Sequence, residues 1–186
     1  MDLYQLHRPD YLMDPVEVGS AFSRLKKAGK VREFGVSNFH PSQVSALQSA
    51  CPMKLLVNQV EISLANLARL EDGTLDQCLA ERITPMAWSP LASGMLGDGA
   101  TKVLPSQESY KPRPVKAVLN RIAKAHGATP IAVALAWLLK HPSGIIPIIG
   151  STRPEKILDA ARATDLSLSR EEWYQLLQAA RGERLP

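Results

Sequence analysis

An α/β fold with parallel strands is the class that the sequence predicts, and three observations predict it. Short apolar segments alternate along the 186 residues with longer segments in which apolar residues recur at helical spacing. A capping residue followed by proline opens several helical segments, as in Asp14-Pro15 and Thr129-Pro130. Polar residues gather directly after the apolar segments. Strands that alternate with helices in this way form parallel βαβ units.

Five short strands are expected, and they are placed at residues 3–6, 33–37, 55–62, 84–89 and 145–149. A barrel and a doubly wound sheet both carry their chemistry at the carboxyl ends of such strands, so pattern alone does not separate them. The G-x-G-x-x-G turn of a Rossmann site is not found, because Gly97-Asp98-Gly99 neither follows a strand nor opens a helix.

Helices are expected between and after the strands. They begin at or beside Asp14-Pro15, His40-Pro41, Thr74, Val115, Thr129-Pro130, Pro154 and the Ser169/Glu172 capping box. The helix after Thr129 is apolar nearly all round and should be buried. The connection at residues 91–114 is long for a loop, and long loops are often functional.

Composition narrows the class of protein. Hydrophobic residues make up 45% of the chain and charged residues 22%, which is ordinary for a globular domain. The longest apolar run, residues 131–139, is too short to cross a bilayer, and no signal-peptide pattern is found. Cys51 and Cys78 fit no metal or redox spacing. We therefore expect a cytoplasmic protein with reduced thiols, no metal site and no membrane partner.

The net charge is +4, and a basic stretch lies between residues 24 and 32, so nucleic-acid binding has to be considered. The stretch has no interleaved aromatic residues and no known nucleic-acid motif. Basic residues at the end of a helix also suit the helix dipole. A solvated helix end is therefore the preferred interpretation, and no nucleic-acid partner is expected. The residues are Arg24, Lys26, Lys27, Lys30 and Arg32.

Short motifs stand at the predicted strand ends. They are LYQLHRPD at residues 3–10, GVSNF at 35–39, NQVE at 58–61, WSPL at 88–91 and IPIIGSTRP at 146–154. Each motif is weak alone. Together and in this order they resemble the aldo-keto reductase superfamily over essentially the whole chain. The resemblance implies a (β/α)8 TIM barrel that binds NADP(H) without a Rossmann fold and reduces aldehydes and ketones.

The resemblance matches one member of the family's catalytic tetrad of Asp, Tyr, Lys and His. His7 corresponds to the histidine that follows the fourth family strand and hydrogen-bonds the substrate carbonyl. The other three members lie on earlier strands without a counterpart here, and Tyr4 lies within the strand that delivers His7. The chain is therefore expected to be a single partial domain, residues 1–186, in which the barrel is truncated to about five C-terminal βα units.

The resemblance also implies a nicotinamide and pyrophosphate site. Ser37, Asn38 and Gln59 are expected to hydrogen-bond the carboxamide, which needs donors and acceptors together; turn chemistry is the alternative for Ser and Asn. Trp88 is expected to stack on the nicotinamide ring, with a core tryptophan as the alternative. The residues expected to line the pyrophosphate, partly through backbone N–H groups, are Ser89, Pro90, Leu91, Ala92 and Ser93.

A second part of the implied NADP(H) site lies where the last strand meets a helix. A helix N-terminus offers N–H groups and a positive dipole to an anion. Arg153 and Lys156 add charge that favours the 2′-phosphate of NADP over the hydroxyl of NAD. An ordinary capped surface helix is the alternative. The residues of this part are Gly150, Ser151, Thr152, Arg153 and Lys156.

Two functions remain open. The first is an oxidoreductase, or a fragment of one without the catalytic Tyr, Lys and Asp, that transfers hydride between NADP(H) and an aldehyde or ketone. The second is a non-enzymatic remnant of the family that binds a nucleotide or a partner. In either case, the open barrel edges at residues 3–6 and 145–149 are expected to favour self-association.

Overall fold

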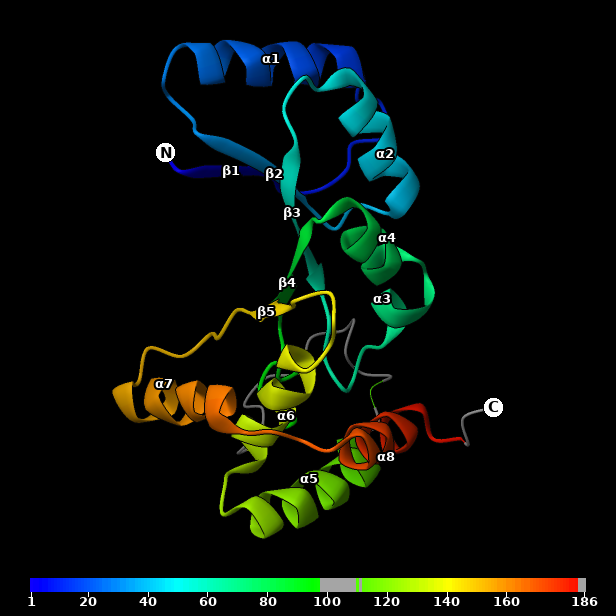
Figure 1. Ribbon diagram of the computed structural model, residues 1–186, viewed down its shortest axis with the longest axis vertical. Helices are drawn as coiled ribbons and strands as arrows, with labels where there is room; N and C mark the ends of the chain where they lie inside the picture. Colours follow the sequence, from blue (N-terminus) through cyan, green and yellow to red (C-terminus); the bar gives the residue numbers. More distant parts are fainter. Residues whose placement is uncertain (98–109, 111, 184–186) are drawn as a thin grey trace. The chain divides into compact units, whose positions relative to one another are not determined.

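The structure is a computed structural model that describes residues 1–97, 110 and 112–183 (Figure 1). The described strands form one five-stranded sheet in sequence order, and β1 pairs with β2, and β2 with β3, in parallel. The strands are β1 (Leu3–Leu6), β2 (Glu33–Ser37), β3 (Leu55–Glu61), β4 (Thr84–Trp88) and β5 (Ile146–Pro147). The predicted fold class is confirmed. The last strand is shorter than the predicted 145–149, and Pro147 has no N–H to extend a ladder.

The described helices are α1 (Pro15–Lys27), α2 (Pro41–Ala50), α3 (Ala68–Glu71), α4 (Thr74–Glu81), α5 (Pro112–His126), α6 (Pro130–Leu139), α7 (Pro154–Ala161) and α8 (Arg170–Arg181). The helix α3 and the 3₁₀ turn Arg162–Asp165 were not predicted, because a single turn is too short to show a period. The helix α5 begins inside the segment predicted as a connection.

The chain divides into two compact units. The first unit comprises Met1–Val60 and Arg69–Met86, and the second comprises Glu61–Ala68 and Ala87–Pro186. The strand β4 passes from the first unit into the second, while β1 and β2 belong wholly to the first. A single partial domain over residues 1–186 stays a prediction.

In the first unit, α1 and α2 lie side by side (Figure 1). The core is apolar and aromatic: Phe34 of β2 is fully buried and stacks on Phe22 of α1 with ring centroids 4.2 Å apart. The two helices approach closely at Gly19, where an added Cβ would lie 2.3 Å from the carbonyl oxygen of Ala50. Only glycine allows this approach.

The start of α4 differs from the prediction that Thr74 caps it. Gly73 is the N-cap, with a φ of +83°, and Thr74 is the first helical residue. The Asp72 side chain accepts a hydrogen bond from the Thr74 N–H at 2.9 Å and so takes the role predicted for threonine. Asp72-Gly73-Thr74 offers three capping residue types in a row, and the pattern does not say which one caps.

In the second unit, α6 is the core helix, as predicted, and every residue from Ile131 to Leu138 is buried. The Thr129 hydroxyl caps it by accepting from the Ala132 N–H at 3.1 Å. Trp137 of α6 stacks on Trp173 of α8, with ring centroids 5.1 Å apart. Each indole N–H donates to the other residue's backbone carbonyl, at 3.1 and 3.0 Å.

Within the described residues, no helix taken singly has the length and apolar character that a bilayer crossing requires. The helices α5 and α6 reach that length and composition only as a pair bent by 95°.

Candidate functional site

In the first unit, the ends of β1, β2 and β3 bring together four predicted site residues. The Asn38 backbone N–H donates to the carbonyl oxygen of Gln59 at 2.9 Å, and the Ser37 hydroxyl donates to the same oxygen at 2.7 Å. The Asn38 side-chain amide donates to the Ser37 hydroxyl oxygen at 3.1 Å and to the His7 carbonyl at 3.5 Å. These contacts hold His7, Ser37, Asn38 and Gln59 in one cluster.

The hydrogen bonds also show which groups of this cluster are still available. Ser37 is 3% exposed and its proton is used, so its oxygen can accept but not donate. Asn38 has a φ of +62°, which asparagine tolerates better than most residues. The Gln59 side-chain amide makes no hydrogen bond within the described part of the chain. Gln59 therefore offers both a donor and an acceptor, while Ser37 holds Asn38 in place.

In the second unit, a cavity of about 700 Å³ lies between the turn after β4 and the start of α7. Trp88 and the following turn form one side, and the residues before and within α7 form the other. The predicted site residues that line it are Trp88, Ser89, Pro90, Leu91, Ser93, Gly150, Ser151, Arg153 and Lys156. Ala92 is fully buried and does not line the cavity, and neither does Thr152.

The turn after β4 has an unusual backbone. Ser89, Ala92 and Ser93 all have φ near +50°, a conformation that costs side-chain-bearing residues about 1–2 kcal/mol each. Their N–H groups are partly used within the turn. Ala92 donates to the Ser89 carbonyl at 2.8 Å, and Ser93 donates to the Ser89 hydroxyl at 3.1 Å. Both N–H groups therefore already have an acceptor inside the turn. Their predicted contact with the pyrophosphate stays a prediction.

Arg153 is the N-cap of α7, and Pro154 follows it without an N–H. The Arg153 N–H donates to the Ser151 hydroxyl at 3.2 Å, and the Lys156 N–H donates to the Arg153 carbonyl at 3.0 Å. The Arg153 guanidinium lies 3.7 Å from the Glu155 carboxylate, with both side chains about two-thirds exposed. A surface pair of this kind is weak. Anion attraction at this helix start therefore comes mainly from side-chain charge.

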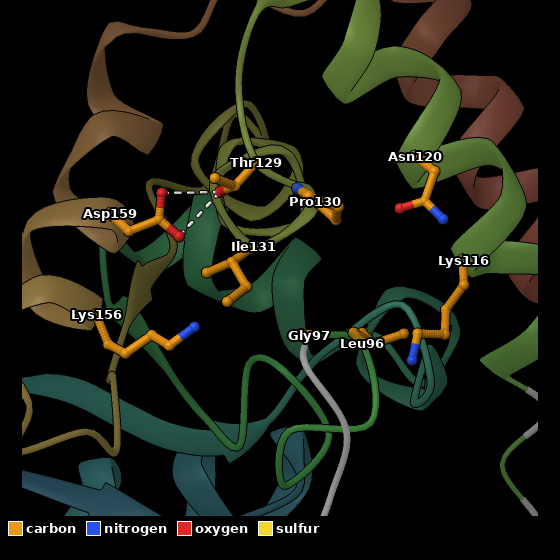
Figure 2. Close-up of a pocket in the computed structure, with 9 residues that line it drawn as sticks. All are labelled: Leu96, Gly97, Lys116, Asn120, Thr129, Pro130, Ile131, Lys156 and Asp159. Carbon is orange, nitrogen blue, oxygen red and sulfur yellow. Dashed lines mark hydrogen bonds between the residues drawn. The ribbon is translucent and has the colours of Figure 1, made fainter.

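A smaller cavity, of about 350 Å³, lies beside the first and was not foreseen from the sequence (Figure 2). The Thr129 hydroxyl lies 2.9 and 3.0 Å from the two oxygens of the Asp159 carboxylate and donates to them. Gly97, Ile131 and Lys156 line both cavities. Thr129 was predicted as a helix cap, but no sequence signal pairs it with Asp159, which lies 30 residues away.

The shifted pKa values do not identify a general acid. The Tyr110 hydroxyl donates to Glu61 at 2.8 Å, and burial together with this bond raises the pKa of Tyr110 to about 12. Burial raises the pKa of Cys78 to about 12 as well, so its thiol stays protonated. No group of His, Cys, Asp or Glu able to hold a metal ion is found among residues 1–97, 110 and 112–183.

The basic stretch in the first unit is a helix end with local partners. Lys26 lies 3.4 Å from the Glu33 carboxylate and Arg32 lies 2.9 Å from that of Asp2. Arg24, Lys26 and Lys27 occupy the last turn of α1, where positive charge is favourable.

Comparison with known proteins identifies the family, and the match runs along nearly the whole chain. The model of the aldo/keto reductase family matches residues 1–181, and this chain belongs to that family. It is 41% identical over 186 residues to the 6-dehydroglucose reductase of Novosphingobium aromaticivorans and 43% identical over 187 residues to the oxidoreductase YdhF of Escherichia coli. In both comparisons 100% of this chain is covered, but only 59% of the relative. The match is to the C-terminal portion of the family, as predicted.

Solved structures agree with the fold. A thermostable aldo-keto reductase, Tm1743, in complex with the inhibitor epalrestat superposes with a TM-score of 0.82 at 30% identity, over 96% of this chain and 59% of that one. An aldo/keto reductase from Klebsiella pneumoniae in complex with NADP and acetate gives a TM-score of 0.74 at 31% identity, over 95% and 57%. The barrel of these relatives is represented by five strands among the residues that the structure describes.

Proposed function

We propose that the chain forms the cofactor-binding part of an NADP(H)-dependent aldo-keto reductase. The observation that carries this proposal is the cavity of about 700 Å³ in the second unit, with Trp88 on one side and the cations Arg153 and Lys156 on the other. A flat aromatic surface and two cations suit a ligand with a planar ring and phosphate groups. The donors present thus fit NADP(H), and a solved relative is a complex with NADP.

Each residue has a proposed role. Asn38 and Gln59 hold the carboxamide, Ser37 fixes Asn38, and Trp88 orients the ring. Bound NADP(H) supplies or accepts the hydride. His7 donates a hydrogen bond to the oxygen of the carbonyl substrate. The remaining cavity residues surround the phosphate groups: Ser89, Pro90, Leu91, Ser93, Gly150, Ser151, Arg153 and Lys156. Ala92 and Thr152 belong to the same two segments and are proposed to support them from outside the cavity lining.

The proposal is tested by calorimetric titration of the chain with NADPH and with NADH. Arg153→Ala and Lys156→Ala should each weaken NADPH binding by about tenfold, the effect of losing one charged hydrogen bond, and leave NADH binding nearly unchanged. Lys124→Ala, an exposed charge in the same unit, is the control. Equal losses for both cofactors would show that neither side chain meets the 2′-phosphate.

The substrate of the whole protein is proposed to be a small aldehyde or ketone in the cytoplasm. Relatives from Novosphingobium aromaticivorans and Agrobacterium fabrum, 41% and 40% identical, are 6-dehydroglucose reductases. Reduction of 6-dehydroglucose is therefore the first activity to measure with NADPH.

A nucleotide-binding role without catalysis is the second candidate. The family's catalytic Tyr, Lys and Asp have no counterpart among the motifs of this chain, and positioned acid catalysis contributes roughly 10²–10⁴-fold. If this candidate holds, the pure chain binds NADPH but does not oxidise it with a reactive aldehyde. Robust turnover by the pure chain would favour the oxidoreductase.

A further inference from the structure

The smaller cavity of the second unit has two opposing walls (Figure 2). Lys116 and Asn120 stand on α5, and Lys156 and Asp159 stand on α7. In the close-up, the Asn120 amide points toward the cavity from one side and the Lys156 side chain extends into it from the other. Polar groups from two helices that are distant in the sequence thus face a shared space.

The charges around this space do not cancel. The lining has two cations, Lys116 and Lys156, against one anion, Asp159, whose two oxygens share the single proton of the Thr129 hydroxyl. Lys116 makes no ion pair with any residue that the structure describes, and it is only partly exposed. The helix α5 has four basic residues in the sequence PRPVKAVLNRIAKAH, apart from its histidine, and no acidic one. The cavity therefore favours an anion.

Lys156 connects this cavity to the larger one, since it lines both, together with Gly97 and Ile131. An elongated ligand in the larger cavity therefore reaches the smaller one beside Lys156. A phosphate monoester carries up to two negative charges and several acceptor oxygens, so it can bind cationic partners on more than one side, and Arg153 does not line the smaller cavity.

We propose that Lys116 is a further cationic partner of the 2′-phosphate of NADP(H), beside Lys156 and Arg153, and a determinant of cofactor specificity, with Asn120 as an accessory hydrogen-bond donor. The inference rests on the proposed function and deepens it. Lys116 approaches the phosphate from α5, opposite Lys156, and the two walls together select a ribose that carries a phosphate over one that carries a hydroxyl.

The experiment uses adenosine 2′-monophosphate and adenosine as probes, titrated calorimetrically into the full chain. Lys116→Gln should weaken binding of the monophosphate by about tenfold, since one charged partner of the phosphate is lost. Binding of adenosine should stay unchanged. The salt dependence of monophosphate binding should also become shallower, which a purely structural role of Lys116 does not predict. Lys116→Arg should keep most of the affinity.

Lys124→Gln, which removes the same charge from an exposed position of the same helix, is the matched control and should change neither affinity. Circular dichroism checks that each variant is folded. Equal monophosphate affinity in Lys116→Gln and the parent chain overturns the inference, and so does a parent chain that does not bind the monophosphate. The proposed function fails separately, if NADPH itself does not bind or if Arg153→Ala weakens NADPH and NADH equally.

Discussion

At the scale of single residues, Asn38 combines a backbone role with a side-chain role. Its φ of +62° suits glycine even better than asparagine, whereas its amide contacts Ser37 and His7. Asn38→Gly should therefore keep the stability of the chain within about 1 kcal/mol but lose NADPH affinity. Asn38→Ala should lose both, since a Cβ at this φ costs about 1–2 kcal/mol. Urea unfolding and NADPH titration of the two variants separate the roles.

His7, Ser37 and Asn38 lie at the ends of β1 and β2, as predicted, whereas Gln59 lies inside β3. Parallel pairing of the strands brings these positions together. The sequence does not show which of these groups donate hydrogen bonds to one another, because that depends on the side-chain rotamers. Lys116 and Asp159 were not predicted to line one cavity, because only the packing of α5, α6 and α7 brings them to the same space. The part of the connection at 98–109 lies outside the described residues, so its predicted importance stays a prediction.

At the scale of elements, the contact between α1 and α2 depends on Gly19. A Cβ there would lie 2.3 Å from the Ala50 carbonyl oxygen and 3.0 Å from its carbon, so one helix must move. Gly19→Ala should lower the free energy of unfolding by about 1–3 kcal/mol, the usual cost of overpacking, although alanine is the better helix former. Ser20→Ala, on the exposed side of the same helix, should be neutral or slightly stabilising. Equal stability of both variants in urea would contradict the close approach.

The start of α8 should make stability depend on pH. Burial would raise the pKa of Glu172, but hydrogen bonds from the Ser169 N–H and from His126, with the charges of His126 and Arg121, lower it below 4.5. A lowered pKa in the folded state stabilises the protein above pH 4.5 and loses this effect as pH falls through the lowered value. Glu172→Gln should therefore be less stable than the parent at pH 7, and the difference should shrink as the pH falls through that lowered value.

Thermal unfolding from neutral to acidic pH measures this dependence. Glu183→Gln, which removes an exposed carboxylate beyond the end of α8, serves as the control. A difference between Glu172→Gln and the parent that persists unchanged at the acidic end would show that the carboxylate charge is not the cause.

Helix starts were predicted better than short elements. Asp14, Thr129 and Ser169 cap the helices that they were expected to cap. Their side-chain chemistry is local and can be read from neighbouring residues. The strand at 145–149 was overestimated because its apolar residues indicate only burial, whereas a strand also needs a neighbour with which its backbone groups can pair in register.

At the scale of the whole molecule, β1 and β5 stand at the two ends of the strand order, so each presents an unpaired edge within the described sheet. Unpaired edges are templates for association. We expect the isolated chain to form oligomers that grow with concentration in sedimentation velocity. Tyr4→Lys in β1, at a position 37% exposed, should shift the distribution toward monomer by blocking that edge. A clean monomer at all concentrations would contradict the expectation.

The stacked indoles of Trp137 and Trp173 have a consequence for optical measurements. The sequence contains three tryptophans, and the third, Trp88, lines the larger cavity. The two indole centroids lie 5.1 Å apart, close enough for their electronic transitions to couple, so we expect the circular dichroism of the pair to change when α6 and α8 separate. In a Trp137→Phe, Trp173→Phe variant, the fluorescence of Trp88 can then be followed alone while a ligand is added. The chain thus has one tryptophan pair that reports on the packing of α6 against α8, and a separate tryptophan that reports on the larger cavity.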